Sequence, residues 1–272
     1  LKVFGDSSLN KRDMKRIIQP LSKIGCNFYP KDKSTLPLVV EGTDMPLAQI
    51  HFETIGSAQV KSCILLAALN TPGITTIKEE KISRNHTENL LLNIKADIKV
   101  KSISKGNLIS LKGKKSLSSF KLIIPGDQSS AAPFIFLTLL TKSAYLKIKN
   151  INCNPTRTGF VKILKKMNAN IKFINLKKKS GEIVGDIIVR SSLLKPINCS
   201  KKLVPSAIDE FPLLFAIAAM IRGKSKFSGI EELRHKESDR IKTMEFGLNK
   251  IGIKTKSTKN SLTIYGNPEM KI

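Results

Sequence analysis

The hydrophobic positions along this chain follow one plan three times. Each time, a stretch that is apolar on nearly every helical face is followed by a strand, by an amphipathic helix with a polar start, and by two closing strands. The predicted apolar helices lie at 60–69, 126–140 and 211–221. A repeat of about 70 to 80 residues predicts a fold built by duplication.

Second helices and strands complete these three units. The second helices are predicted to begin at 85–88, 154–158 and 236–240. The strands are predicted at 74–77, 98–101 and 108–111, at 144–148, 171–174 and 186–189, and at 226–230, 253–256 and 262–265. Half a unit precedes them, with a helix over 10–24 and a closing strand over 36–40. Because repeat architectures seldom begin in half a unit, and because the first residue is Leu rather than Met, we expect that the chain is cut from a longer protein.

The helices of each unit also predict a place for a ligand. The first helix of each unit is expected to be buried, because it is apolar nearly all round. The second helix begins with polar residues, and Arg84, Arg157 and Arg240 recur at these starts. A helix N-terminus carries unpaired N–H groups and a partial positive charge, so it attracts anions. Several such starts converging on one cleft would make a site for a polyanionic ligand.

The chain has a formal net charge of +26, from 47 Lys and Arg against 21 Asp and Glu. Its lysines alternate with apolar residues, as in 98–101 and 171–173, which is typical of half-buried strands with lysines on the solvent side. Aromatic residues make up only 6%, which argues against base-stacking surfaces, so nucleic-acid binding stays a minor alternative. Only eight basic residues are Arg, and their planar guanidinium grips carboxylate and phosphate in a way that Lys cannot. The arginines are therefore the better candidates for anion binding.

Cysteines, histidines and apolar runs indicate the setting. The four cysteines are far apart and form no C-x-x-C, which favours free thiols in a reducing compartment. The three histidines form no zinc-type cluster, so no metal is expected. No apolar run approaches the roughly 20 residues of a membrane span, and no secretory leader is recognisable. We therefore expect a soluble, cytoplasmic protein.

Two polar segments at helix starts are candidates for catalysis. Asp209 and Glu210 open the apolar helix of the third unit, where a carboxylate can either cap the helix or, when partly desolvated, act as a general base. Residues 236–240 are all polar, and Glu237 and Arg240 share one helix face. This segment is either a solvent-facing cap or an acid beside an anion-gripping Lys and Arg. The pattern alone leaves both alternatives open.

The segment 233–240, Leu-Arg-His-Lys-Glu-Ser-Asp-Arg, closely resembles the L-R-x-K-E-[ST]-D-R signature of the 5-enolpyruvylshikimate-3-phosphate synthases. Four other segments resemble the same family in matching order: Gly-Asp-Ser-Ser-Leu-Asn-Lys-Arg at 5–12, Ser-Ala-Gln-Val-Lys-Ser at 57–62, Asn-Pro-Thr-Arg-Thr-Gly at 154–159 and Ile-Asp-Glu-Phe-Pro at 208–212. The Ser-Ala-Gln form and the segment 84–88 are more similar to the bacterial class II branch. The resemblance covers essentially the whole chain.

The chain departs from the family pattern in two ways. The family usually has Pro after the arginine that matches Arg12, where this chain has Asp13. A carboxylate there either weakens anion binding or points to solvent. The family's N-terminal Lys-Ser pair, its G-N-[SA]-G-T loop (the usual determinant of the glyphosate response) and its C-terminal D-H-R segment are not found in this sequence. We therefore expect that the chain alone is inactive, and a truncated, inactive remnant of the enzyme is an alternative.

The resemblance implies the two-lobed inside-out α/β barrel of the enolpyruvyl transferases, an α/β (α+β) fold of βαβαββ units with helices packed inside each lobe. Residues 1–124 would form one and a half units of the first lobe, and residues 125–272 two units of the second, with a hinge near 125–127. The resemblance further implies that substrates bind in the cleft between the lobes and that no cofactor is needed. It implies small-molecule substrates with neither nucleic acid nor a membrane as partner, and we expect a monomer.

The resemblance also implies the reaction, a step in chorismate and aromatic amino acid biosynthesis. The 5-hydroxyl of shikimate 3-phosphate attacks C2 of phosphoenolpyruvate while C3 gains a proton, and the tetrahedral intermediate then expels phosphate. The implied catalytic residues are Asp209, which orients and deprotonates the hydroxyl, and Glu237, which carries the C3 proton. The implied ligands of shikimate 3-phosphate are Ser57, Gln59, Arg84, Asp209 and Lys236. Those of phosphoenolpyruvate are Arg12, Gln59 and Arg240.

A sister transferase that acts on UDP-N-acetylglucosamine is a further alternative. The segments 208–212 and 236–240 argue against it, and its cysteine-bearing loop is not recognisable in this sequence. The coding sequence on either side of this chain would show whether the missing motifs exist in a longer parent.

Overall fold

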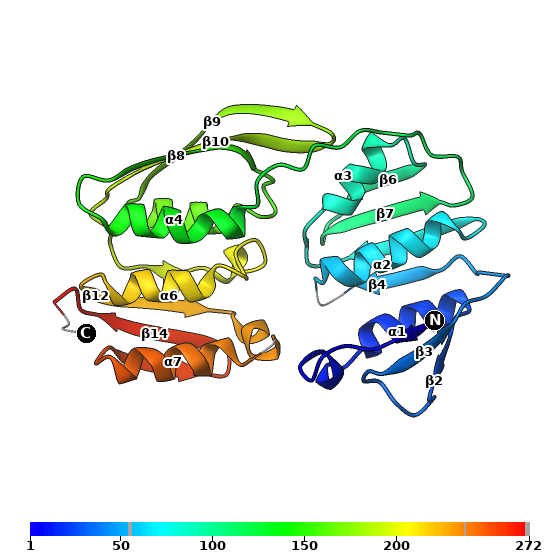
Figure 1. The fold of residues 1–272 in the computed structure, drawn as a ribbon, viewed down its shortest axis with the longest axis horizontal. Coiled ribbons are helices and arrows are strands. Elements are labelled where there is room, and N and C mark those ends of the chain that lie inside the picture. Colours follow the sequence, from blue (N-terminus) through cyan, green and yellow to red (C-terminus); the bar gives the residue numbers. More distant parts are fainter. Residues whose placement is uncertain (54–55, 237, 270–272) are drawn as a thin grey trace. The chain divides into compact units, whose positions relative to one another are not determined.

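The computed structural model describes residues 1–53, 56–236 and 238–269 (Figure 1). Residue contacts divide the chain into two units, Leu1–Leu122 and Ile123–Ile272. The boundary expected from the sequence follows residue 124. Each unit has its own buried hydrophobic cluster and is described by itself. No described helix is long and apolar enough to cross a bilayer.

Unit 1 is built from short helices and two antiparallel or mixed sheets. Its helices are α1 (Lys15–Ile24), α2 (Ala58–Leu69) and α3 (His86–Asn93), with the 3-10 turn η1 (Leu9–Lys11) before them. Its strands are β1 (Lys2–Val3), β2 (Asn27–Tyr29), β3 (Leu38–Glu41), β4 (Ile50–Glu53), β5 (Ile74–Glu79), β6 (Ile98–Ser102) and β7 (Asn107–Lys112). They form sheets in the orders β1-β3-β2 and β4-β5-β7-β6.

The larger sheet of unit 1 is a complete βαβαββ unit. Strands β4 and β5 pair in parallel, as a crossover through α2 requires, whereas β5, β7 and β6 pair antiparallel. Helix α2 packs on β5 and β7, and α3 packs on β6. Ile77 and Ile109 stand opposite each other in the register and are fully buried in one cluster with Ile64 and Leu65 of α2. The apolar side of the sheet is therefore covered by the apolar helix of the same unit.

Unit 2 contains two repeats of the same plan. Its helices are α4 (Gln128–Leu140), α5 (Gly159–Lys166), α6 (Phe211–Ala219) and α7 (Arg240–Lys250), with the 3-10 turns η2 (Lys201–Leu203) and η3 (Glu231–His235). Its strands are β8 (Tyr145–Asn152), β9 (Asn170–Lys179), β10 (Glu182–Arg190), β11 (Asn198–Cys199), β12 (Gly223–Ser228), β13 (Lys254–Thr258) and β14 (Ser261–Gly266). They form sheets in the orders β8-β10-β9 and β11-β12-β14-β13.

Strand order shows that the repeats are equivalent. The sheet β11-β12-β14-β13 has a parallel first pair and antiparallel later pairs, like β4-β5-β7-β6. In the middle repeat, a parallel bridge between Gly126 and Ile151 stands where the other two repeats have a first strand. The order β1-β3-β2 matches the last three strands of the plan. The first residues of the chain thus have the strand order of the second part of a repeat.

Each repeat also closes in the same way. After the last strand, one backbone N–H donates to a carbonyl near the C-terminal end of the apolar helix. These bonds join Lys114 to Leu69 (2.9 Å), Ser192 to Leu139 (3.1 Å) and Asn267 to Ala219 (2.9 Å). In the first and third repeats a glycine precedes the donor, because a Cβ on Gly113 would lie 2.0 Å from the carbonyl oxygen of Thr71, and one on Gly266 equally close to that of Ile221.

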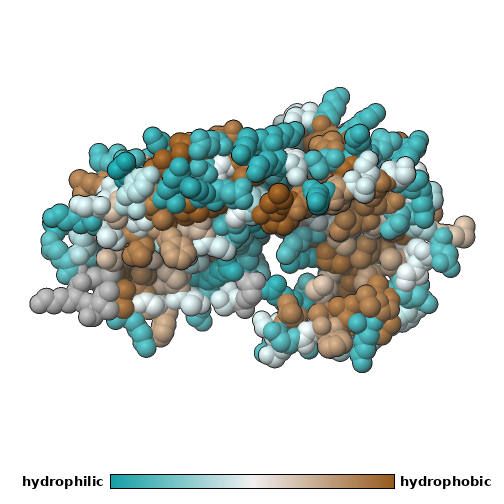
Figure 2. Space-filling view, turned by 45° about the horizontal axis from the view of Figure 1, so that its top comes forward, coloured by the Kyte–Doolittle hydropathy of each residue, from teal (hydrophilic) through white to brown (hydrophobic). Residues whose placement is uncertain are grey.

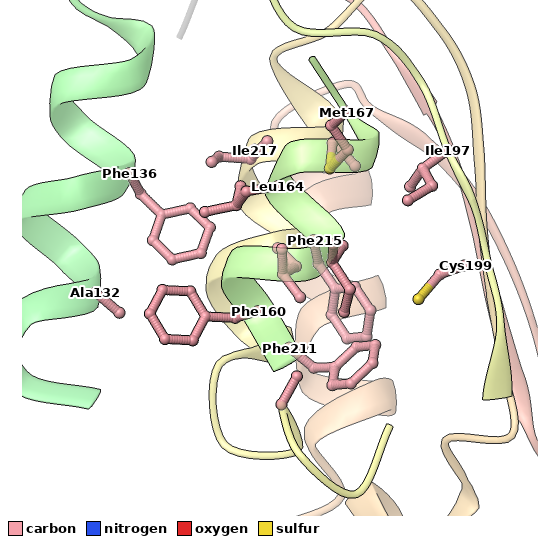
Figure 3. Packing of buried hydrophobic residues seen from close by; sticks show 14 of the residues in the cluster. Ala132, Phe136, Phe160, Leu164, Met167, Ile197, Cys199, Phe211, Phe215 and Ile217 are labelled. Carbon is pink, nitrogen blue, oxygen red and sulfur yellow. The ribbon is translucent and has the colours of Figure 1, made fainter. Parts of the chain in front are cut away.

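The core of unit 2 lies where its helices meet between two sheets. Helix α4 packs on β8, β10 and α6, and α6 packs on β14 (Figure 1). The rings of Phe211, Phe215 and Phe227 have centroids 5.1 to 5.9 Å apart. Phe136 of α4 points toward Phe160 of α5, with 6.3 Å between the ring centroids (Figure 3). The apolar helices are thus on the inside of the unit and the sheets on the outside.

The structure differs from the sequence predictions in its short elements. The helix predicted over 10–24 begins only at Lys15, because Asp13 forms a β-bridge with Thr35 and its carboxylate accepts the N–H of Lys15 at 2.9 Å. Strands β1, β2, β4 and β11 are absent from the sequence prediction. They have only two to four residues, too few to display an alternating pattern.

The expectation that the apolar helices are buried is wrong for part of α4, and for Leu66 of α2, which is 54% exposed. Phe134 and Leu137 are 63% and 66% exposed, although their neighbours Ile135 and Phe136 are buried. The contacts of α4 with its sheet and with α6 cover only part of the helix surface. Other hydrophobic side chains are also exposed, and the face seen in Figure 2 shows them among hydrophilic residues.

Candidate active site

Two adjacent acids stand where α6 begins. The apolar residues from Phe211 onward draw α6 into the core, and Pro212 lies in its first turn, where its missing N–H is harmless. Glu210 is the N-cap residue and is only 3% exposed. The side chain of Asp209 is 31% exposed. The two acids are therefore presented to different surroundings.

Two cations face Asp209. Its Oδ1 lies 3.6 Å from Nζ of Lys236 and 3.7 Å from Nη1 of Arg240. Lys236 follows η3, and Arg240 is the first residue of α7. Both distances exceed the roughly 2.7–2.9 Å of a charge-assisted hydrogen bond. These are loose ion pairs, and their cations can move toward another anion without breaking a short bond to Asp209.

A short ion pair braces the start of α7. Asp239 caps the helix, since its Oδ1 accepts the N–H of Lys242 at 2.9 Å, and its Oδ2 accepts from Nη1 of Arg234 at 2.7 Å. Burial opposes the ionisation of Asp239, but the hydrogen bonds from Lys242 and Arg234 and the charge of Arg234 prevail and lower the pKa of Asp239. Asp239 is therefore a structural carboxylate.

Arg234 also anchors this segment to the neighbouring β-turn. It donates to the carbonyl oxygens of Thr258 and Lys259, at 2.6 and 2.9 Å. Lys236 and Arg240 flank the braced segment, so their placement depends on it. Glu237, the predicted carrier of the C3 proton, lies outside the described residues.

A polar network joins three helix starts beside Asp209. The hydroxyl of Ser129 donates to Oε1 of Glu210 at 2.5 Å and accepts from Nη2 of Arg157, also at 2.5 Å. Nη2 of Arg157 also donates to Oδ1 of Asp127 at 3.2 Å. The network connects the starts of α4 and α6 with the loop that leads into α5. Arg157 is predicted from the sequence as a helix-start arginine without a role, whereas Ser129 and Asp127 are not predicted as site residues.

Asp127 caps α4 in the manner of Asp239 on α7. Its Oδ2 accepts the backbone N–H and the hydroxyl of Ser130, at 2.8 and 2.9 Å. Burial opposes the ionisation of Asp127, but the bonds from Ser130 and the charge of Arg157 prevail and lower the pKa of Asp127. The acid is therefore held ionised at a positive helix end.

In unit 1, the predicted residues at the start of α2 are Ser57 and Gln59. Ser57 is the N-cap residue, and its hydroxyl accepts the N–H of Val60 at 3.4 Å. Oε1 of the buried Glu53 accepts the N–H groups of Gly56 and Ser57, at 3.1 and 3.5 Å. Gln59 is exposed. Ser57 is therefore the cap of α2, and the side chain of Gln59 is accessible to a ligand.

The two remaining predicted arginines also lie just before helices. Arg84 precedes Asn85, the N-cap residue of α3, and Arg12 precedes α1, and both are half-buried. Asp13 is exposed, and the N–H of Lys15 bound by its carboxylate lowers the pKa of Asp13. The carboxylate that replaces the family's Pro is thus attached to the start of α1.

The structure brings predicted site residues into contact in unit 2, whereas those of unit 1 share only their place near helix starts. In unit 2 the structure brings Asp209 together with Lys236 and Arg240. In such a group the acid can accept a proton from a hydroxyl, and the two cations can bind a carboxylate or a phosphate. In unit 1 the predicted residues lie at or just before helix starts: Arg12, Ser57, Gln59 and Arg84. In the part of the chain that the structure describes, no three His, Cys, Asp or Glu side chains are placed to hold a metal ion.

Comparison with known protein families gives a match over nearly the whole chain. The family described as EPSP synthase (3-phosphoshikimate 1-carboxyvinyltransferase) matches residues 2–271. A 3-phosphoshikimate 1-carboxyvinyltransferase of Zymomonas mobilis is 42% identical over 264 residues, which cover 97% of this chain and 58% of that protein. The protein of that name from Petrotoga mobilis is 41% identical over 271 residues, which cover 99% of this chain and 62% of that protein. The chain thus spans about three fifths of the length of the curated relatives it matches.

Solved structures agree with the sequence comparison. An EPSP synthase from Acinetobacter baumannii matches with a TM-score of 0.84 and 38% identity, over 98% of this chain and 60% of that chain. The enolpyruvyl transferase NikO from Streptomyces tendae matches with a TM-score of 0.63 at 13% identity, over 93% of this chain and 58% of that chain, which shows a shared fold.

Proposed function

Because this chain belongs to the EPSP synthase family, we propose that its residues serve the transfer of the enolpyruvyl group from phosphoenolpyruvate to the 5-hydroxyl of shikimate 3-phosphate, with release of phosphate. One observation carries the proposal. The family's signature segment places Lys236 and Arg240 within 4 Å of Asp209, so that an acid and two anion-binding groups meet. This reaction belongs to chorismate and aromatic amino acid biosynthesis.

In this proposal Asp209 is the group that binds the 5-hydroxyl of shikimate 3-phosphate and takes its proton. The long ion pairs support this role. A substrate phosphate or carboxylate can draw Lys236 and Arg240 toward itself, because a dianion attracts them more strongly than a single carboxylate does. Asp209 is then left as the acceptor for the hydroxyl proton, the geometry that a general base needs.

The bonds change in two stages. The deprotonated 5-oxygen forms a bond to C2 of phosphoenolpyruvate while C3 takes a proton from Glu237. The bond from C2 to the phosphate oxygen then breaks, phosphate leaves with the electron pair, and C3 returns a proton to restore the double bond. Lys236 is a possible partner in either proton transfer. Arg240 and Lys236 also offset the negative charge that develops on the departing phosphate.

The remaining residues bind the substrates. We assign Ser57, Gln59, Arg84 and Lys236 to shikimate 3-phosphate, and Arg12, Gln59 and Arg240 to phosphoenolpyruvate. The half-buried positions of Arg12 and Arg84 before helix starts support this, since a guanidinium and a helix N-terminus together attract a dianion.

We further place this reaction in the cytoplasm, in a monomeric enzyme without a cofactor. The four cysteines, two of them buried, are free thiols, as expected in a reducing compartment. Light scattering on the purified chain tests the monomer.

The test uses a chimera in which this chain replaces the matched segment of the Zymomonas mobilis relative. Phosphate release is measured with phosphoenolpyruvate and shikimate 3-phosphate. We expect turnover by the chimera, a loss of about 10²–10⁴-fold in kcat for Asp209→Ala, and a largely unchanged affinity for phosphoenolpyruvate. Glu237→Gln is expected to slow the exchange of the C3 protons of phosphoenolpyruvate with deuterium from solvent by a similar factor.

The control for Asp209 is the exposed loop residue Asp44, whose replacement by Ala should leave kcat unchanged. A chimera that folds but releases no phosphate would contradict the proposal. Release with UDP-N-acetylglucosamine in place of shikimate 3-phosphate would favour the sister transferase. Exchange at the parent rate in Glu237→Gln would exclude Glu237 as the carrier of the C3 proton.

A further inference from the structure

A fully buried lysine lies one turn into α2. Lys61 is 0% exposed, and its Nζ lies 2.9 Å from Oε1 of Glu79 and 2.6 Å from Oε1 of Glu88. Both acids are buried as well. Lysine is seldom buried completely unless it is paired, and here it has two short ion pairs at once.

The partners of Lys61 come from two other elements. Glu79 is the last residue of β5, and Glu88 lies in the first turn of α3. A second contact lies beside the first, since the hydroxyls of Ser62 in α2 and Thr87 in α3 are 2.6 Å apart. Residues 61 and 62 of α2 are therefore bonded to residues 88 and 87 of α3, and the first turns of the two helices are fixed to each other.

Glu79 extends the same cluster into the loop before α3. Its Oε1 also accepts the backbone N–H of Ser83 at 2.9 Å and the hydroxyl of Ser83 at 2.5 Å. Ser83 directly precedes Arg84. One carboxylate oxygen thus holds both the ammonium of Lys61 and the residue beside a predicted phosphate-binding arginine.

The charges of this cluster do not balance when both acids are ionised. Oε2 of Glu79 and Oε2 of Glu88 are buried without a hydrogen-bond partner. Burial raises the pKa of Glu88, against the attraction of Lys61. Well-packed apolar side chains often stabilise such a site as well as or better than buried charges do. What the charges add is a set of short, directed bonds.

We propose that Lys61 is a positioning residue of the shikimate 3-phosphate site, because its ammonium fixes the start of α2, with Ser57 and Gln59, relative to the loop before Arg84 and the helix start after it. The proposal rests on the proposed function for the identity of the ligand. It does not depend on that function for the clamp itself, which is a property of unit 1.

The test compares amide hydrogen exchange in the full chain and in the triple variant Lys61→Met, Glu79→Gln, Glu88→Gln. This variant leaves no uncompensated buried charge. Three amides report the clamp, those of residue 61, Ser83 and Asn89, which are hydrogen-bonded in the parent. We expect each to exchange at least about tenfold faster, while amides of β6 and β7 change by less than about twofold. The matched control is Lys99→Met on the exposed side of β6.

Protection that is unchanged at all three amides in a folded triple variant would overturn the proposal. If the triple variant does not fold, Glu88→Leu decides, because it keeps the one-to-one pair of Lys61 and Glu79. In this variant the amide of Asn89 should exchange faster, while the amide of Ser83 should keep its protection. Equal protection of Asn89 in parent and Glu88→Leu would likewise overturn the clamp.

A ligand measurement separates the clamp from the proposed function. Shikimate 3-phosphate is titrated into the parent, the triple variant and Lys99→Met, and its Kd is read from amide shifts. We expect the triple variant to bind at least about tenfold more weakly at unchanged thermal stability. Equal Kd values for parent and triple variant would overturn the positioning role. If the parent itself shows no shifts, the assignment of unit 1 to this substrate fails, whereas the exchange comparison, which contains no ligand, still decides the clamp.

Discussion

At the scale of single residues, neighbouring side chains of one type have different surroundings. Asp209 faces two half-buried cations at 3.6 and 3.7 Å, whereas Glu210 is buried and accepts the hydroxyl of Ser129. Consecutive side chains at a helix start point in different directions, so a single step along the chain changes exposure and partners. The same holds for Arg240 and Lys242, which lie two residues apart on α7.

We therefore predict that Arg240→Lys is far more damaging than Lys242→Arg in the chimera. Arg240 is placed beside Asp209, and its planar guanidinium can bind a carboxylate or phosphate through two parallel N–H bonds. For Lys242, the bond to the cap is made by its backbone N–H, which the swap keeps. The KM for phosphoenolpyruvate should rise about tenfold or more for Arg240→Lys and stay near the parent value for Lys242→Arg. Equal changes would remove Arg240 from the site.

At the scale of elements, helix starts are the recurring device of this fold. Ser57, Asp127 and Asp239 each cap a helix with a side-chain oxygen. Such caps fix where a helix begins, and hence where the residues on either side of the cap are presented. Gly113 after β7 and Gly266 at the end of β14 do the same for the helix ends, because they let the chain approach the last carbonyls of α2 and α6.

The cap of α4 predicts a pH dependence. The pKa of Asp127 in the folded chain lies below its ordinary value of 3.8, so its ionised form contributes stability above pH 4, and this contribution is lost as the pH falls through the folded-state pKa. Asp127→Asn keeps a capping oxygen without the charge. Its free energy of unfolding, measured with urea, should be about 0.3–1 kcal/mol below that of the parent at pH 7. This difference should disappear below pH 4. The exposed Asp97→Asn serves as control. A stability difference that does not change with pH would show that the charge of Asp127 does not stabilise the helix.

Replacement by alanine is expected to have opposite effects at Gly113 and at Gly247. Gly113→Ala places a Cβ 2.0 Å from a backbone oxygen that cannot move aside, so it should destabilise unit 1 by about 1–3 kcal/mol. Gly247 lies inside α7 with open space around its Cα, and Gly247→Ala should be neutral or stabilise by up to about 1 kcal/mol. Urea unfolding of both variants measures this. If both variants lose a similar amount of unfolding free energy, neither helix propensity nor the close approach of the backbone decides the effect.

At the scale of the whole molecule, duplication explains the architecture. Three repeats share one strand order, and the half unit at the start shares its last part. Each repeat buries its apolar helix against its own sheet. The sheet of a single repeat covers only one side of that helix. Phe134 and Leu137 on α4 and Leu66 on α2 are exposed, so this covering is incomplete on both helices.

We predict that the chain alone releases far less phosphate from phosphoenolpyruvate and shikimate 3-phosphate than the chimera does. The chain spans about three fifths of its relatives, and several anion-binding motifs of the family are not found in its sequence. Both proteins are assayed at equal concentration. Turnover by the chain alone at the rate of the chimera would show that those motifs are dispensable.

The sequence by itself determined the repeat, the class of nearly every long element and the family. Apolar residues recur at helical or alternating spacing because burial of one face is a local property of the chain, so the helices ending at Leu69, Leu140 and Ala219 could be predicted. The signature of residues 233–240 is equally local, and it indicated Lys236 and Arg240 without any knowledge of the fold.

Only the tertiary structure decided which residues meet. The bonds from Ser129 to Glu210 and from Lys61 to Glu79 and Glu88 span 81, 18 and 27 positions along the chain, and no spacing rule links such positions. Lysine also predicts an exposed position by its chemistry, so the burial of Lys61 could not be inferred without its two carboxylate partners. Short strands such as β11 exist only because β12 offers them hydrogen bonds. Local patterns report burial of a face, whereas electrostatic pairing and strand addition depend on groups that folding brings together from distant parts of the sequence.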